Sequence, residues 1–332
     1  RECDRMTRQR MRRATGAVVA VTTAVTLSSC GLGTSGGLTT SAKLAGPLAS
    51  VKKLDGLDIA VGSKDFTEQQ ILGKIAVIML QSGGAKVKDF TAIPGSAASR
   101  QAQLTGQVQL IMEYTGTAWI TYMGKTDPIA DSRKQYEAVK AEDAKNGFTW
   151  LEPAPMNNTY SLGMRQDFAK KYGLKDLSDL KKVPVGERTF CIESEFANRN
   201  DGFQPMLKAY GMTYGKDVPT GNIRKMDTGA IYSAIDQKVC NLGEVFTTDG
   251  RIKSLHLDVM SDSKHFFPNY NVSPVVKTTI YDTYPQIAQI LEPVVKKLDN
   301  DTLIDLNARV DVEGKDPGKV AEEWLKSEGF IE

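Results

Sequence analysis

Short apolar runs alternate with longer amphipathic segments in the first half of the chain, starting near residue 57. The runs have the length and bounds of buried strands, and the segments between them have helical spacing. We predict strands at residues 57–62, 87–92, 108–112 and 148–151, and helices at residues 67–80, 97–104 and 131–146. A capping-box spacing from Thr67 to Gln70 is predicted to open the first helix. Such alternation is typical of a doubly wound parallel sheet.

The same alternation returns in the second half of the chain. We predict strands at residues 189–192, 221–225 and 239–246, with helices at residues 202–210 and 228–237. Two extended segments, residues 159–164 and 271–276, lie between the two units and are interpreted as paired crossover strands. The tail from residue 282 is predicted to be helical. The pattern therefore predicts an α/β protein in which each of two lobes contains a doubly wound sheet.

The N-terminal segment has a different composition from the rest of the chain. Five arginines between residues 5 and 13 precede an uncharged stretch at residues 17–27, which is too short to span a bilayer but suits a signal peptide over residues 1–29. The sequence Leu27-Ser28-Ser29-Cys30 resembles a bacterial lipobox, which implies that Cys30 is lipidated; the alternative is an ordinary signal peptide that contains a cysteine. Residues 30–52 are rich in Gly, Ser and Thr and are predicted to form a flexible tether.

The composition and the absence of known motifs argue against several classes of function. The 332 residues include 42 basic and 40 acidic side chains, a net charge of +2, which argues against a nucleic-acid-binding surface. The two histidines do not have a metal-ligand spacing, and no P-loop is present. We therefore expect no catalytic residues, no metal and no cofactor, and we predict that the protein is not an enzyme.

Six short motifs occur in order from residue 62 to residue 270. They are residues 62–69 (GSKDFTEQ), 113–118 (EYTGTA), 158–160 (NTY), 195–202 (EFANRNDG), 247–252 (TTDGRI) and 265–270 (HFFPNY). Together they resemble the osmoprotectant-binding proteins of ABC importers, which take up glycine betaine, choline, carnitine and proline betaine. The resemblance implies a two-lobed periplasmic-binding-protein fold of type II. Its lobe 1 would comprise residues 53–160 and 271–332, and its lobe 2 residues 161–270.

The resemblance also implies a ligand site. A trimethylammonium group has no hydrogen-bonding atoms, so proteins hold it with charge and with aromatic faces. By motif, the cage residues are Tyr114, Tyr160 and Tyr270, with Phe246 where a fourth tyrosine is common in the family and Asn158 as a polar neighbour. Lys64, Thr117 and Arg199 match positions that engage the carboxylate of betaines.

Each of these residues has a structural alternative. A single tyrosine is more often packed in a core than bound to a ligand, and Lys64 and Arg199 could be solvated surface charges. Asp249 and Arg251 are interpreted as a structural pair outside the site. The case for the cage is joint placement, because its members fall at or near the ends of predicted strands, where open α/β sheets bind ligands.

Two cysteines remain in the predicted folded part, Cys191 and Cys240. Both lie at the start of predicted strands, and a 2-1-3 strand order would make those strands neighbours. Adjacent strands are close enough for a disulfide, which exported proteins commonly form. The alternative is a pair of buried free thiols.

The sequence therefore predicts an extracytoplasmic, lipid-anchored solute-binding protein for a quaternary ammonium compound. Its partners would be this small ligand, the permease and ATPase of an ABC importer, and the membrane through the lipid anchor, with no nucleic acid. Two alternatives stay open: a binding protein of the same fold for another solute such as an amino acid, and a lipid-anchored enzyme.

Overall fold

The structure is a computed structural model that describes residues 42–332. The predicted signal peptide, Cys30 and the first part of the predicted tether lie outside the described residues. Within the described part, no helix is both long and apolar enough to cross a bilayer.

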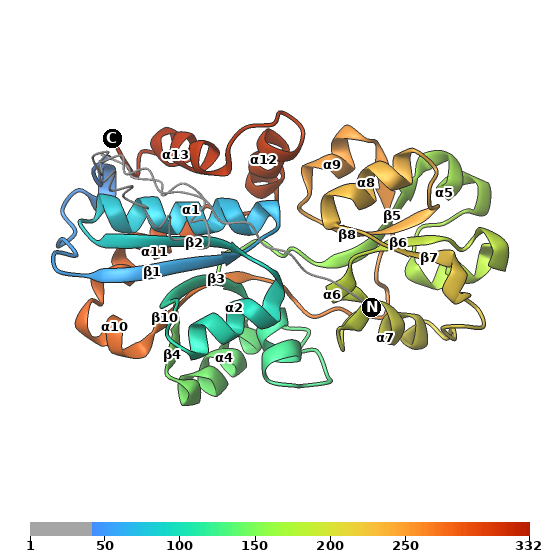
Figure 1. The fold of residues 1–332 in the computed structure, drawn as a ribbon, viewed down its shortest axis with the longest axis horizontal. Coiled ribbons are helices and arrows are strands. Elements are labelled where there is room, and N and C mark those ends of the chain that lie inside the picture. Colours follow the sequence, from blue (N-terminus) through green and yellow to red (C-terminus); the bar gives the residue numbers. More distant parts are fainter. Residues whose placement is uncertain (1–41) are drawn as a thin grey trace, which may run out of the picture. The chain divides into compact units, whose positions relative to one another are not determined.

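The first sheet has five strands in the order β2-β1-β3-β10-β4 (Figure 1). The strands are β1 (Asp58–Lys64), β2 (Lys86–Ile93), β3 (Leu110–Tyr114), β4 (Phe148–Trp150) and β10 (Val272–Lys277). The first three in sequence are parallel, and β10 runs antiparallel to both β3 and β4. The sheet is therefore mixed, because a strand from the C-terminal part of the chain enters it in the reverse direction.

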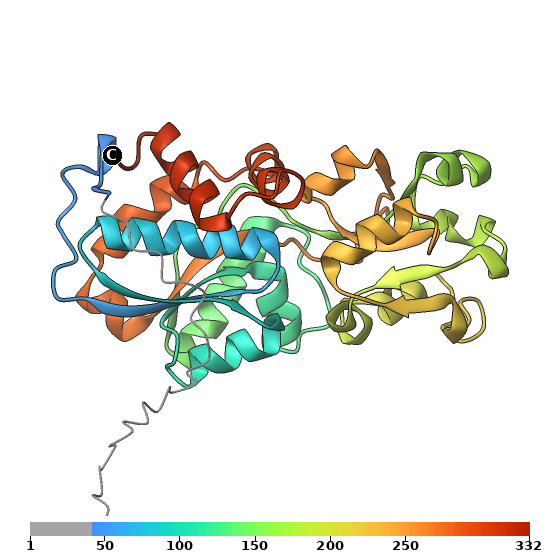
Figure 2. The ribbon, with the colours of Figure 1, turned by 45° about the horizontal axis from the view of Figure 1, so that its top comes forward.

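Helices cover both faces of this sheet. Along β3, Leu110 and Met112 belong to the large apolar core with α1, whereas Ile111 packs in a separate cluster with α2. This division follows from the two-residue repeat of a strand, which sends alternate side chains to opposite faces. The helices are α1 (Thr67–Ser82), α2 (Gly95–Leu104), the single turn α3 (Thr115–Thr117), α4 (Ser132–Asp143), α10 (Thr278–Thr283), α11 (Gln286–Val295), α12 (Asn300–Asp311) and α13 (Pro317–Ser327). Figure 2 shows α12 and α13 beside α1, and both helices contact it.

The second sheet repeats the design in the order β7-β6-β8-β5-β9. Its strands are β5 (Tyr160–Arg165), β6 (Phe190–Ile192), β7 (Ile223–Lys225), β8 (Leu242–Phe246) and β9 (Leu257–Val259). Strands β6, β7 and β8 are parallel in 2-1-3 order, and β5 is antiparallel to β8 and β9. Around it lie α5 (Gln166–Tyr172), α6 (Ser194–Asn198), α7 (Phe203–Ala209), α8 (Thr228–Asp236) and α9 (Gly250–Ser254).

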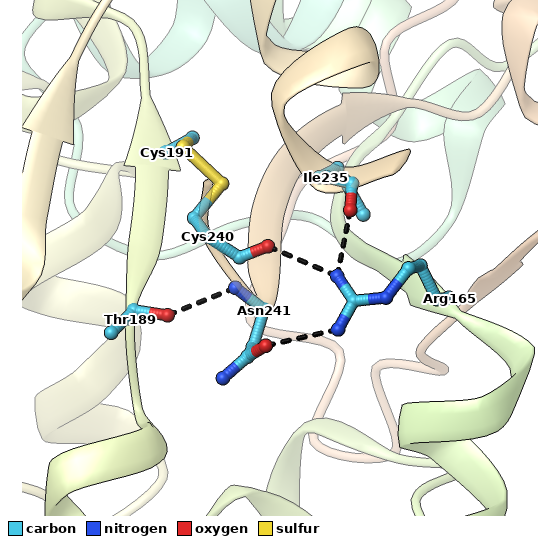
Figure 3. The surroundings of a disulfide bond; sticks show 6 residues. All are labelled: Arg165, Thr189, Cys191, Ile235, Cys240 and Asn241. Atoms are coloured by element: carbon cyan, nitrogen blue, oxygen red, sulfur yellow. Dashed lines mark hydrogen bonds between the residues drawn. A yellow bond between two sulfur atoms is a disulfide. The ribbon is translucent and has the colours of Figure 1, made fainter. Parts of the chain in front are cut away.

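A disulfide joins Cys191 to Cys240, and their Cα atoms are 5.8 Å apart (Figure 3). Cys191 lies in β6, and Cys240 lies two residues before β8, which starts later than the sequence pattern predicts. Both sulfurs sit in the apolar cluster under α8. The Arg165 guanidinium fixes the turn from α8 to Cys240, since it donates to the carbonyls of Ile235 and Cys240 and to the side chain of Asn241.

Two local predictions were wrong. The extended segments at residues 159–164 and 271–276 do form β5 and β10, but they belong to different sheets and do not pair with each other. The residues just before the two strands meet, where the backbone amide of Asn158 donates to the Tyr270 carbonyl. The capping box at Thr67–Gln70 is also absent, because the N-cap residue is Phe66 and the Thr67 hydroxyl donates to Asp311 instead.

Candidate functional site

A cavity of about 500 Å³ is lined by residues from both sheets. Lys64 ends β1 and Tyr114 ends β3, while Phe246 ends β8. The antiparallel strands bring two further residues to the same edges. Tyr160 pairs with Phe246 at the start of β5, and Val272 pairs with Tyr114, which places Tyr270 two residues beyond that edge. The carboxyl edges of the parallel strands thus face the cavity, as ligand sites of open α/β sheets do.

Among residues 42–332, five aromatic side chains line the cavity: Phe66, Tyr114, Tyr160, Phe246 and Tyr270. They form one connected set. The Phe66 ring stacks on Phe246 at 5.2 Å and on Tyr114 at 6.2 Å between centroids. Tyr160 is 5.2 Å from Phe246 and meets Tyr270 edge-on at 5.5 Å. Together the rings give the cavity a continuous aromatic wall.

Carboxylates hold two of these tyrosines from behind. The Tyr114 hydroxyl donates to Glu68 Oε1 at 2.7 Å, and the Tyr270 hydroxyl donates to Asp201 Oδ2 at 2.6 Å. Both phenols are buried, and burial, with the carboxylate charge adding to it, raises the pKa of each hydroxyl well above its usual value. A hydroxyl that donates to an anion polarises its ring toward negative charge. The wall is therefore suited to a cation that offers no hydrogen bonds.

Glu68 itself is a buried meeting point of distant segments. Its carboxylate also accepts from Asn158 at 2.9 Å, from the Thr248 hydroxyl after β8, and from Asn307 of α12 at 3.0 Å. Burial raises the pKa of this carboxyl in spite of the four donors. The sequence analysis did not assign Glu68 to the site, although it lies inside the motif at residues 62–69.

Lys64, Thr117 and Asn158 all line the cavity and are buried. The Lys64 ammonium donates to Glu113 Oε1 at 2.7 Å and lies 5.0 Å from the centre of the Tyr114 ring. Asn158 is held by Glu68, as described above. Of the eight predicted ligand-contact residues, seven come together at the cavity surface.

Arg199 is the exception, because it is not among the residues that line the cavity. Its guanidinium is buried and makes two hydrogen bonds of 2.7 Å to Asp201, a third of 3.0 Å to Glu195, and a contact of 5.4 Å with the Tyr160 ring centre. Three of its N–H groups are bonded to the carboxylates of Asp201 and Glu195, which lie close by in sequence. That Arg199 engages a ligand carboxylate stays a prediction.

Acidic side chains form the part of the wall that sequence reasoning missed. Glu193, Glu195 and Glu244 line the cavity from the second sheet and α6. Burial raises the pKa of Glu244 to about 8, and the neighbouring Glu193 adds to the effect. Phe66 was also missed. Its only sequence signal is its place in the motif at residues 62–69, because an isolated Phe before a helix is usually a packing residue.

Asp249 and Arg251 are paired through two hydrogen bonds, as predicted, and Arg251 also pairs with Asp311 of α12 at 3.2 Å. Arg251 nevertheless reaches the cavity surface. In the described part of the chain, no group of His, Cys, Asp and Glu side chains is arranged to hold a metal ion.

Two mixed α/β sheets with a lined cavity at their carboxyl edges have the geometry in which open α/β proteins bind small ligands. The chain belongs to the family described as the substrate binding domain of the ABC-type glycine betaine transport system, whose model matches residues 58–327. Members of this family are components of transporters and not enzymes. The family assignment therefore excludes the alternative that the protein is a lipid-anchored enzyme.

Named proteins that are similar in sequence support the same family assignment. The chain is 38% identical over 282 residues to the glycine-betaine-binding protein of Pseudomonas aeruginosa, covering 82% of this chain and 89% of the relative. It is 35% identical over 278 residues to the glycine betaine-binding protein YehZ of Escherichia coli, covering 82% and 91%. An ergothioneine transport permease and binding protein, EgtU of Helicobacter pylori, is 33% identical over 274 residues, which cover 82% of this chain and 48% of that protein.

Solved structures agree on the fold. The apo structure of Escherichia coli YehZ matches with a TM-score of 0.61 and 34% identity over 82% of this chain and 99% of that one. A structure described as a glycine betaine/carnitine/choline ABC transporter matches with a TM-score of 0.67 and 27% identity over 81% and 98%. The two-lobed periplasmic-binding-protein fold predicted from the sequence is thus confirmed.

Proposed function

We propose that this protein captures a quaternary ammonium osmoprotectant in the cavity between its two sheets and delivers it to an ABC importer. The observation that carries this proposal is the connected wall of five aromatic rings. Cation–π contacts contribute roughly 0.5–2 kcal/mol each, so several rings supply much of the ~8 kcal/mol that micromolar binding needs. Relatives named as glycine-betaine-binding and carnitine transport binding proteins support the same ligand class.

The residues proposed to contact the ligand are Lys64, Tyr114, Thr117, Asn158, Tyr160, Phe246 and Tyr270, together with Phe66. The rings would surround the trimethylammonium group, and the polar residues would hold the rest of the ligand. Arg199 would act one step away, through its contacts with Glu195 and the Tyr160 ring.

Isothermal titration calorimetry of the mature protein tests this function. The panel comprises glycine betaine, choline, carnitine and proline betaine, with glycine and proline as amino acids without the quaternary group. We expect binding by at least one methylated ligand and none by glycine. Binding of an amino acid in preference to every methylated ligand would favour the other solute class and reject this proposal.

We also propose that the protein is anchored to the outer face of the membrane by lipid on Cys30, with the segment up to residue 52 as a tether. Only the sequence Leu27-Ser28-Ser29-Cys30 supports this. Metabolic labelling with a radioactive fatty acid should mark the native protein and not the Cys30→Ala variant. Equal labelling of both would reject the anchor.

The two lobes are proposed to move as units: residues 53–160 with 271–332, and residues 161–270. The connecting segments lie between β4 and β5 and between β9 and β10. Closure of two lobes around a ligand is a common transition of solute-binding proteins. Ligand-dependent protection of cavity residues in hydrogen exchange is expected, and unchanged exchange with saturating ligand would contradict the movement.

A further inference from the structure

Glu195 lies in α6, beside the second sheet, and its side chain reaches a helix that covers the first sheet. Its Oε2 accepts a hydrogen bond of 3.0 Å from the Ser96 amide, at the N-terminal end of the ten-residue helix α2. Its Oε1 accepts from Arg199 at 3.0 Å. The approach is close: a side chain at Gly95 would bring a Cβ to 2.9 Å from Glu195 Oε2.

The Glu195 carboxylate thus takes the donors that a bound anion would use. Free backbone amides and the dipole at a helix N-terminus attract negative charge, and a guanidinium does so more strongly. The charge of Lys64, the Ser96 amide and Arg199 outweigh burial and lower the pKa of Glu195. The protein supplies its own anion at this place.

The other cations at or near the cavity have internal partners too. Lys64 is paired with Glu113 at 2.7 Å, and Arg199 with Asp201 at 2.7 Å. Arg251 is paired with both Asp249 and Asp311. A ligand carboxylate entering this cavity would therefore approach cations whose charge is already balanced by carboxylates of the protein.

The net charge of the side chains that line the cavity also favours a ligand without a carboxylate. Among the described residues that line the cavity, two side chains are basic, Lys64 and Arg251, and five are acidic: Asp65, Glu193, Glu195, Asp227 and Glu244. Burial raises the pKa of Glu244 to about 8, so Glu244 is largely protonated at neutral pH and the excess of negative charge rests on the other four. A cavity with one sign of charge in excess favours ligands of the opposite net charge. Choline carries a net positive charge, whereas glycine betaine is a zwitterion with a carboxylate.

We infer that the site prefers a quaternary ammonium ligand without a carboxylate, and that Glu195 is the residue that sets this preference. The inference rests on the proposed function and narrows its ligand class. It departs from the expectation that Lys64 and Arg199 receive a ligand carboxylate. Glu195 instead occupies the anion-binding donors and adds negative charge beside the aromatic wall.

Choline and glycine betaine form a matched pair of probes, because they share the trimethylammonium group and differ at the other end. By calorimetry at neutral pH, the native protein is expected to bind choline about ten-fold or more tightly than glycine betaine. In Glu195→Ala this ratio should fall by about five-fold or more, because glycine betaine gains the Ser96 amide and Arg199 as partners while choline loses a neighbouring anion. Glu195→Gln keeps the shape of the side chain and should shift the ratio in the same direction.

Asp227→Asn is the matched control. Asp227 lines the cavity on the same side and is exposed, but its side chain makes no cap bond to α8. Its loss removes one negative charge without freeing the Ser96 amide. Choline binding should weaken slightly and glycine betaine binding should not improve.

Each outcome decides the question. A native protein that binds glycine betaine as well as choline, or better, overturns the inference and leaves the proposed function standing. A choline preference that survives unchanged in both Glu195 variants overturns the role of Glu195. Absence of binding by every methylated ligand rejects the proposed function itself. If Glu195→Ala fails to fold, as judged by circular dichroism, Glu195→Gln carries the test.

Discussion

The two sheets have the same strand order but are stabilised differently. In each, three parallel strands stand in 2-1-3 order, the next strand runs in the reverse direction, and an edge strand antiparallel to that one completes the sheet. The first sheet is covered by α1, a sixteen-residue helix in which twelve residues are buried. The longest helix that covers the second sheet is α8, with nine residues and four of them buried. The second lobe instead has the disulfide between Cys191 and Cys240.

This difference concerns the α8 face of the second sheet, where the buried apolar cluster has eight residues and includes both cysteines. A small cluster makes a small hydrophobic contribution to the free energy of folding, and exported domains commonly add a covalent link. The link joins the middle of β6 to the segment just before β8, and neither cysteine lines the cavity. It can therefore stabilise the second lobe without touching the ligand.

The largest expected effect is loss of this disulfide. The Cys191→Ala, Cys240→Ala double variant should lose about 4 kcal/mol of unfolding free energy, by the chain-entropy estimate for the 49-residue separation. Urea unfolding of the oxidised native protein and of the variant measures the difference. Dithiothreitol should destabilise the native protein and leave the variant unchanged. A native protein that is indifferent to reduction would contradict the comparison between the lobes.

The next effect concerns Glu68, where the two lobes meet. In Glu68→Gln, the side-chain NH₂ can no longer accept, so one pair of donors, either Tyr114 and Asn158 or Thr248 and Asn307, loses its acceptor. We expect a loss of roughly 1–3 kcal/mol in unfolding free energy, because buried donors are left unpaired. Thermal and urea unfolding are the measurements. Gln70→Glu is a control on the same helix, since Gln70 makes its bond outside the buried network, to the Asp65 carbonyl.

The aromatic wall allows one ring from each sheet to be compared. Tyr114→Ala in β3 of the first sheet and Tyr160→Ala in β5 of the second should each weaken ligand binding by about 1–2 kcal/mol, through loss of a desolvated cation–π face. Tyr114→Phe should cost less, because the ring stays and only the bond to Glu68 is lost. Calorimetry with the best ligand of the panel measures each. The exposed Tyr214→Ala variant should bind like the native protein. Unchanged affinity in both cage variants would reject the aromatic site.

The strands could be predicted from the sequence because they depend on local pattern: a short apolar run such as β1 is bounded by polar residues. The ring positions came from the resemblance of short motifs, such as the one that contains Tyr114, to the osmoprotectant-binding family. Contacts between residues that are far apart in the sequence cannot be predicted in this way. That Glu113 neutralises Lys64, or that Glu195 reaches the Ser96 amide, depends on contacts 49 and 99 residues apart in the chain. Such pairings decide the charge of the site, and no local pattern reports them.

The smallest expected effect is a pH dependence that separates two buried carboxyls. Glu113 in the first sheet accepts a hydrogen bond from the Lys64 ammonium, whereas Glu244 in the second accepts one from the Glu193 amide. Burial, reinforced by Glu193 and Glu195 and opposed by Arg199, raises the pKa of Glu244 to about 8 from its ordinary value of 4.5.

At neutral pH the folded protein therefore holds a proton on Glu244 that the unfolded chain has released. The stabilising contribution of this proton is fully present below pH 4.5 and is lost as the pH rises through about 8. A bound cation favours the ionised carboxyl, so ligand binding should release a proton at pH 7, and affinity for choline should rise between about pH 7 and pH 9. Calorimetry in buffers of different ionisation enthalpy counts the protons. In Glu244→Gln both the proton release and the rise in affinity should become smaller. Glu195 has a lowered pKa and is already ionised at pH 7, whereas burial also raises the pKa of Glu193 and leaves it as a second group that can release a proton. A native protein whose binding releases no proton at pH 7 would contradict the raised pKa of Glu244.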